Sequence, residues 1–201
     1  MPRVAGQIDL VKSEAILDAA SEVLAERGMS APMEEIARRA GVSKQTVYNH
    51  YGSKTELVRA LVARRSDSIT AALREPGAVE NPEDTLAAYA ATLLKVITTK
   101  SYSLMRVTML SAMEMPDVAR VMFETGALRS RRLLAGFLEA EDKAGRLAIP
   151  DPLQAAEFFG GMVVGHRQTQ TMLGLTEELS DAEIEAIARE AARRFLRAYA
   201  R

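Results

Sequence analysis

A short run of polar residues, 43–50, carries the side chains best suited to hydrogen-bond chemistry. Gln45 and Asn49 stand four residues apart, so on a helix their amides project from the same face. Each amide offers a donor and an acceptor, which matches the edge of an adenine base in the major groove of DNA. The neighbouring side chains are also polar where a packed helix would show a wide apolar stripe: Lys44, Thr46, Tyr48 and His50. The run therefore predicts contacts with nucleic acid.

The local charge favours the same chemistry. Residues 36–55 contain four basic residues and no acidic one, whereas the whole chain of 201 residues has a net charge of -1. The four are Arg38, Arg39, Lys44 and Lys54. A phosphate-facing surface needs this asymmetry, because phosphate contacts supply much of the affinity for DNA. The alternative interpretation is an ordinary corner of a helical bundle whose polar face is solvated.

Residues that support catalysis or metal binding are sparse. The chain has no cysteine, which excludes disulfides, thiolate nucleophiles and cysteine-ligated zinc, and its two histidines, His50 and His166, lie far apart. No phosphate-binding glycine loop or catalytic triad is visible. We therefore expect no enzyme activity, no catalytic residue, no metal and no cofactor. Because no signal peptide or membrane-spanning run is visible, we expect a cytoplasmic protein without membrane contacts.

The elements that position the polar run are helical. Apolar residues recur at helical spacing almost everywhere, which predicts an all-α fold of about nine helices. Ser43 is a suitable N-cap, and Ser53 with Glu56 forms a capping box. Gly28 and Gly52 are suitable helix ends. The first four helices are predicted at 10–27, 32–40, 44–51 and 54–74.

A larger helical body follows a loop at 75–82, which is rich in proline and glycine. Gly145 and Gly174 mark helix ends, and Ser180 with Glu183 marks a start. The predicted helices of the body are 83–99, 103–113, 117–144, 152–173 and 181–200.

Order and spacing favour a helix-turn-helix over an ordinary corner. Two short helices joined by a three-residue turn containing glycine describe this motif, whose second helix enters the major groove. The segment 36–57, IARRAGVSKQTVYNHYGSKTEL, together with the run 19–28, closely resembles the DNA-binding signature of the TetR family of transcriptional regulators. In this sequence Pro32 stands near where family members carry Ser or Thr, so the expected hydroxyl contact to phosphate is missing there.

The resemblance implies a homodimeric repressor that binds an operator with an inverted repeat and is released by a small-molecule inducer. It implies a DNA-binding domain at 10–58, with the helix-turn-helix at about 32–51, and a ligand-binding and dimerisation domain at 59–201. Thr46, Tyr48 and Lys54 would contact phosphates, Lys44, Gln45 and Asn49 would read bases, and His50 would do either. Ser43 and Arg38 complete the predicted DNA-binding set. Val42, Val47 and Tyr51 would pack the unit together.

The body is also similar to the AefR-like group of TetR C-terminal domains, in the segments 104–107, 115–119, 145–147 and 151–152. Methionine is a flexible residue common at adaptable binding surfaces, and three of them lie at i, i+4 and i+8. The predicted ligand set is Met105, Met109, Met113, Phe123, Phe159, Met162 and His166. The alternative is a plain apolar core. If a ligand binds, we expect a small apolar or amphipathic molecule.

Small residues form a strip in the helix predicted at 152–173. Glycine inside a helix costs up to about 1 kcal/mol relative to alanine, and close approach of another helix can offset that cost. The resemblance implies a dimer interface formed by the last two long helices, 152–173 and 181–200, and the residues predicted for it are Ala156, Gly160, Gly161, Gly165 and Phe195. The alternative is a smooth wall of a ligand cavity. A second hypothesis for the whole protein is a DNA-bound regulator whose body docks a protein partner.

Overall fold

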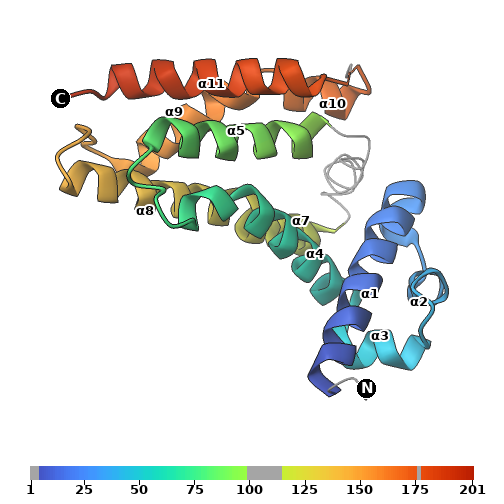
Figure 1. Ribbon diagram of the computed structural model, residues 1–201. Helices are drawn as coiled ribbons and strands as arrows, with labels where there is room; N and C mark the ends of the chain where they lie inside the picture. The colour runs from blue at the N-terminus through green and yellow to red at the C-terminus, as the bar shows by residue number, and fades with distance from the viewer. Residues whose placement is uncertain (1–4, 99–114, 176–177) are drawn as a thin grey trace. The chain divides into compact units, whose positions relative to one another are not determined.

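The computed structural model describes residues 5–98, 115–175 and 178–201 and shows an α-helical protein (Figure 1). Within these residues the chain forms no strand, and one isolated bridge pairs Leu147 with Ala200. The predicted all-α fold is therefore confirmed. The helix predicted at 103–113 lies outside the described residues. Among the described helices, none combines the length and the apolar character needed to cross a membrane.

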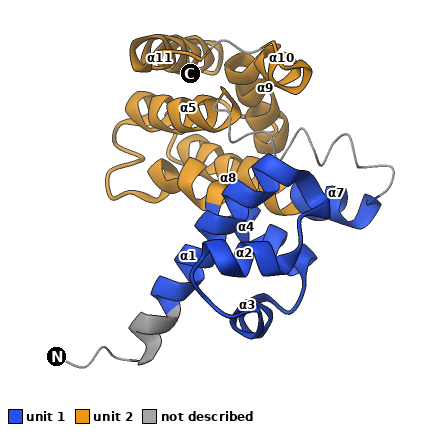
Figure 2. Ribbon diagram, turned by 90° about the vertical axis from the view of Figure 1, so that its right-hand side faces the viewer, with its two compact units in different colours: residues 1–64, 101–123 blue, residues 65–100, 124–201 orange. Residues whose placement is uncertain are grey.

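The described residues gather into two compact units, which Figure 2 colours separately. We call them the head and the body. Within the described chain the head consists of residues 5–64 and 115–123, and the body of 65–98, 124–175 and 178–201. The chain crosses between them inside helix α4 (Lys54–Ile69) and inside a π-helical segment, Phe123–Leu128. The functional division after residue 58 stays a prediction.

The head is built around one apolar core. Its helices are α1 (Ala5–Arg27), α2 (Met33–Arg39), α3 (Lys44–Tyr51), the start of α4, and α7 (Pro116–Met122). Ile16 from α1, Ile36 from α2 and Leu57 from α4 are fully buried in this core. Val118 and Met122 of α7 belong to the same cluster, so residues far along the sequence complete the core of the head.

The approach to α2 differs from the sequence prediction. Pro32 is the N-cap of α2, with φ -73° and ψ 146°, and not its first helical residue. A 3-10 turn, Gly28–Ser30, precedes it, and the positive φ of 69° at Gly28 ends α1 as predicted. The Ser30 hydroxyl donates to the carbonyl of Arg27 at 3.1 Å, so Ser30 does not cap α2.

The body is a layered packing of helices around a cluster of aromatic rings. Its helices are α5 (Pro82–Thr98), α8 (Arg129–Lys143), α9 (Pro152–Val164), α10 (Arg167–Leu173) and α11 (Asp181–Ala198), with a 3-10 turn at Ala71–Arg74. α11 packs along α5 and also against α9 (Figure 1). Phe159 lies between Tyr89 and Phe195, with ring centroids 6.1 and 5.1 Å away. The rings join these three helices.

Three helices predicted as continuous are interrupted. The prediction 152–173 is wrong at Gly165, where φ 53° and ψ -130° end α9 in a conformation that favours glycine. The prediction 117–144 is divided by the π-helical segment Phe123–Leu128, which contains Thr125 and Gly126, both poor helix formers. The predicted fourth helix ends at Ile69 and continues as a 3-10 turn.

Candidate nucleic-acid interface

The turn between α2 and α3 is fixed by local bonds that the sequence predicts. Gly41 adopts φ 66°, which favours glycine, and the amide of Val42 donates to the carbonyl of Ala37 at 3.0 Å. The Ser43 hydroxyl then accepts from the amide of Thr46 at 3.0 Å and caps α3. The structure therefore confirms Ser43 as the N-cap, and α3 has the predicted bounds, 44–51.

One face of α3 is held against the core of the head. Val47 is fully buried, and Val42 and Tyr51 pack against the same cluster, as predicted. The Tyr51 hydroxyl hydrogen-bonds the Ser13 hydroxyl at 2.7 Å and donates to its carbonyl at 3.2 Å, which joins the end of α3 to α1. These contacts fix which face of α3 points outward.

The predicted DNA-binding residues are all exposed or half-buried, and most of them lie on α3. The exposed members are Arg38, Ser43, Lys44, Gln45, Tyr48 and Asn49, and the half-buried ones are Thr46, His50 and Lys54. Gln45 Nε2 donates to Asn49 Oδ1 at 2.8 Å, so the two amides face each other and form one hydrogen-bonded couple. The geometry presents polar groups on an exposed helix that is anchored from behind.

Three of the four basic residues of the segment 36–55 have acidic partners from outside it. Arg39 donates two hydrogen bonds to Glu26, at 2.6 and 2.9 Å, and Arg38 pairs with Glu35 at 2.7 Å. Lys44 forms an ion pair with Glu34. The local charge is therefore less positive than the sequence segment implies. The sequence analysis did not predict that Glu26, Glu34 and Glu35 pair with these basic residues, although the spacing of Glu35 and Arg38 is that of a usual helical pair.

These pairs perturb the titration of the groups involved. The hydrogen bond from Lys44 lowers the pKa of Glu34 below its ordinary value, and the charge of Lys54 lowers it further. The hydrogen bond to Glu34 raises the pKa of Lys44. The Lys44 ammonium also lies 5.6 Å from the centre of the Tyr48 ring, within the range of a cation–π contact. Lys44 and Glu34 therefore keep their charges at neutral pH.

Lys54 is tied to the head by its ammonium group. Lys54 Nζ donates to the carbonyl of Met29 at 2.9 Å and so links the start of α4 to the 3-10 turn after α1. An ammonium carries three donors, which leaves others for a phosphate. The structure thus gives Lys54 a structural contact beside its predicted role.

The residues predicted to bind a ligand are distributed over the chain. Met105, Met109 and Met113 lie outside the described residues. Phe159 is fully buried in the aromatic cluster of the body, whereas Phe123, Met162 and His166 are exposed.

The residues predicted for the dimer interface fall into two groups. Ala156 and Phe195 are buried within the body, whereas Gly161 and Gly165 are exposed and Gly160 is intermediate. A Cβ added at Gly160 or Gly161 would meet nothing within 4 Å, so no neighbour in the described chain requires glycine at either position.

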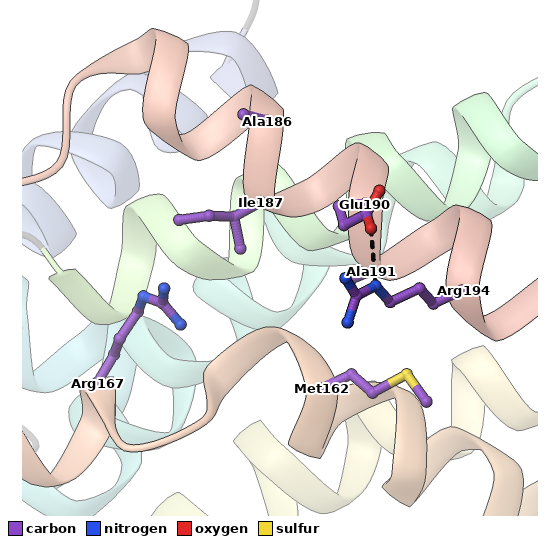
Figure 3. Close-up of a pocket in the computed structure, with 7 residues that line it drawn as sticks. All are labelled: Met162, Arg167, Ala186, Ile187, Glu190, Ala191 and Arg194. Carbon is purple, nitrogen blue, oxygen red and sulfur yellow. Dashed lines mark hydrogen bonds and ion pairs between the residues drawn. The ribbon is translucent and has the colours of Figure 1, made fainter.

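A groove of about 640 Å³ lies between α9 and α11 (Figure 3). It is lined by Met162, Arg167, Ala186, Ile187, Glu190, Ala191 and Arg194. Arg194 Nε donates to Glu190 at 2.7 Å. α9 also exposes apolar side chains: Leu153 is 51%, Phe158 52% and Met162 46% exposed. The lining of the groove itself combines apolar side chains with charged ones.

Two family models match the chain. One, described as bacterial regulatory proteins of the tetR family, matches residues 16–61, and the other, described as the C-terminal domain of AefR-like transcriptional repressors, matches residues 84–201. Among the described residues, no group of three acidic, histidine or cysteine side chains is placed to hold a metal ion.

Curated relatives match the region of the helix-turn-helix. The HTH-type transcriptional activator FasR of Mycolicibacterium smegmatis is 48% identical over 61 residues, which cover 30% of this chain and 28% of the relative. The HTH-type transcriptional repressor LfrR of the same species is 40% identical over 70 residues, which cover 35% and 36%. The chain thus spans only about a third of these curated relatives' lengths.

Solved structures match over nearly the whole chain. The TetR transcriptional regulator from Agrobacterium tumefaciens is 27% identical, covers 94% of each chain and has a TM-score of 0.74. The flavonoid-responsive regulator FrrA is 30% identical, with 94% of this chain and 97% of that chain covered and a TM-score of 0.69.

Proposed function

This chain belongs to the TetR family of transcriptional regulators, and on that premise we propose that it is a ligand-released repressor of a palindromic operator. The match of residues 84–201 to AefR-like repressors supports repression. The curated relatives include an activator, FasR, and a repressor, LfrR, so repression rather than activation is part of the proposal.

The observation that carries the proposal is the arrangement of α3. Buried Val47 and the bonds of Tyr51 hold one face of the helix, and Gln45 and Asn49 stand on the exposed face. A helix held in this way can enter the major groove and place amides against base edges. We assign base reading to Lys44, Gln45 and Asn49. Phosphate contacts are assigned to Thr46, Tyr48 and Lys54.

The homodimer is proposed to form through the exposed face of α9. Phe158 and Met162, four residues apart on the same side of α9, expose apolar side chains of the kind that a partner helix covers. The open space at Gly160 and Gly161 would let a second helix approach closely. Ala156 and Phe195, which are buried, would support this face from behind rather than contact the partner.

The inducer is proposed to be a small apolar or amphipathic molecule. The 30% identical relative FrrA is a flavonoid-responsive regulator, and flavonoids are of this class. The candidate ligand residues are those predicted from the sequence: Met105, Met109, Met113, Phe123, Phe159, Met162 and His166. The competing proposal is a protein partner docked on the body.

We further propose that the chain works without a cofactor and without enzymatic activity, in the cytoplasm where it would meet its operator. The matched families and relatives are regulators by description, and that likeness supports the proposal.

Selection of DNA from a random pool tests the proposed function. The purified protein should enrich duplexes that contain an inverted repeat. Lys54→Ala should weaken binding to all sequences similarly and reduce the salt slope by about 1. Absence of enrichment, or unchanged binding by both Lys54→Ala and the double variant Gln45→Ala/Asn49→Ala, would contradict the assignment of α3.

A thermal-shift screen tests the nature of the effector. A ligand-released repressor should be stabilised by at least one small molecule, beginning with flavonoids, and that molecule should weaken binding to the selected duplex. If no compound stabilises the protein and an added protein releases it from DNA, the competing proposal is favoured.

A further inference from the structure

Glu34 forms an ion pair with a residue proposed to touch DNA. It lies in the first turn of α2, and its carboxylate pairs with the ammonium of Lys44, the first residue of α3. The Lys44 side chain is 53% exposed and that of Glu34 is 55% exposed. The pair therefore joins two helices at the surface from which the helix-turn-helix would approach its DNA.

The pair between Glu34 and Lys44 contributes little to the stability of the fold. An ion pair between exposed side chains contributes between nothing and about 1 kcal/mol, since water screens it. Lysine is also disfavoured at the start of a helix, where the backbone dipole is positive. The Glu34 carboxylate compensates this cost for Lys44, but the exposed pair can exchange with little loss when a better acceptor arrives.

The other ion pairs of the head differ from this one. Arg39 is held by two hydrogen bonds to Glu26, and Arg38 is held within α2 by Glu35. Neither arginine stands on α3. Lys44 is the basic residue at the start of α3. Its ammonium is available to DNA only when the ion pair with Glu34 breaks.

We propose that Glu34 is a positioning residue for DNA discrimination. On non-cognate duplexes its ion pair with Lys44 persists, and on the cognate site the pair breaks and Lys44 contacts an acceptor at a fixed position. The inference rests on the proposed function of α3. On a random sequence the phosphates move relative to the protein, and a mobile acceptor does not displace the carboxylate. In the fully docked complex, a base edge or a fixed phosphate replaces Glu34.

The test compares wild type with Glu34→Gln, which keeps the side-chain size and removes the charge. Binding is measured by fluorescence anisotropy on a labelled 30-base-pair duplex of scrambled sequence and on a duplex selected by the wild-type protein. For the scrambled duplex we expect about fivefold tighter binding at low salt and a salt slope steeper by about 0.9, the value for one further phosphate contact. For the selected duplex we expect less than about a twofold change and the same slope.

A matched control separates this effect from net charge. Glu139→Gln removes a carboxylate with a similar exposure, 52%, that also pairs with a lysine, Lys143, but lies on α8 of the body. It should leave both duplexes unaffected. In the double variant Glu34→Gln/Lys44→Met the steeper slope should disappear, because Lys44 supplies the extra contact. Thermal melting checks that each variant is folded, and Glu34→Ala serves as a second neutral replacement.

Three outcomes would overturn the inference. These are equal gains on both duplexes, no change on either, or a steeper slope that persists without Lys44. If the wild type itself binds neither duplex in a salt-dependent way, the proposed function fails before Glu34 is tested, so the two failures are distinguishable.

Discussion

The head and the body present different kinds of exposed surface. On α3 of the head, the exposed polar side chains already have partners, with Lys44 paired to Glu34 and Gln45 to Asn49. On α9 of the body, Phe158 and Met162 are about half exposed beside an open groove. The first surface suits a charged partner that can displace weak bonds, and the second suits an apolar partner that excludes water. Salt should therefore weaken recognition by the head far more than recognition by the body.

The largest effect is expected from a charge placed on the apolar face of α9. Phe158→Glu should convert the dimer to a monomer, because a carboxylate buried in an apolar interface without a partner is strongly unfavourable. Loss of the second DNA-binding head should then reduce affinity for an inverted repeat by about 100-fold or more. Sedimentation velocity measures the first effect, and anisotropy on the selected duplex measures the second.

The control for this variant lies on the head. Phe123 is 54% exposed, close to the value for Phe158, so Phe123→Glu introduces the same charge at a similarly exposed aromatic position. It should leave the dimer intact. A Phe158→Glu protein that still sediments as a dimer would show that α9 is not the interface.

The next effect concerns the two amides of α3. Gln45→Ala and Asn49→Ala should each relax specificity at one or two base pairs and cost about 1–3 kcal/mol on the selected duplex. Because Gln45 donates to Asn49 at 2.8 Å, the double variant should lose less than the sum of the two. The affinities of the wild type, the two single variants and the double variant for duplexes with single base changes form a double-mutant cycle that measures this difference. Strict additivity would mean that each amide reads its base alone.

The sequence could predict features that depend on neighbouring residues. Ser43 caps α3, Gly28 and Gly52 take positive φ at helix ends, and Ser180 forms a capping box with Glu183, all at the predicted positions. Each signal depends on a few consecutive residues whose backbone geometry favours those side chains. The bounds of α3 followed from such signals.

Features that depend on contacts between distant segments could not be predicted in this way. The pairs Arg39–Glu26 and Lys44–Glu34 join different helices, so a count of charges over 36–55 missed the compensating acids. The apolar spacing of 152–173 continues across Gly165, which hid the end of α9. The place of Val118 in the core of the head likewise depends on the folded chain.

A smaller effect should separate the stability of the body from DNA reading. The Ser180 hydroxyl caps α11 by accepting from the amide of Glu183 at 3.3 Å. Ser180→Ala removes this cap and should lower the free energy of unfolding by about 1 kcal/mol. The melting temperature should fall by about 2–4 °C. The control Ser68→Ala, at an exposed serine of α4, should change neither the free energy of unfolding nor the melting temperature. An unchanged melting temperature for Ser180→Ala would show that this end of α11 is already open in the folded protein.

The smallest effect is a pH dependence inside the body. Asp67 on α4 accepts from Arg129 at 2.7 Å and from Arg74 at 3.3 Å, and the hydrogen bond from Arg129 is the main cause that lowers the pKa of Asp67. A carboxyl whose pKa is lower in the folded state stabilises the fold above its unfolded pKa of about 4, and this contribution is lost as the pH falls through the folded pKa.

Thermal melts of wild type and Asp67→Asn, taken from pH 7 down to about pH 3, test this pH dependence. The wild type should be more stable at pH 7 by less than about 1 kcal/mol, since water screens a carboxylate that is 46% exposed. The gap should begin to shrink as the pH falls to about 4, the unfolded pKa, and should close only once the pH is below the lower pKa of folded Asp67. A difference that stays constant with pH would mean that Asp67 supports the fold through the shape of its hydrogen bonds and not through its charge.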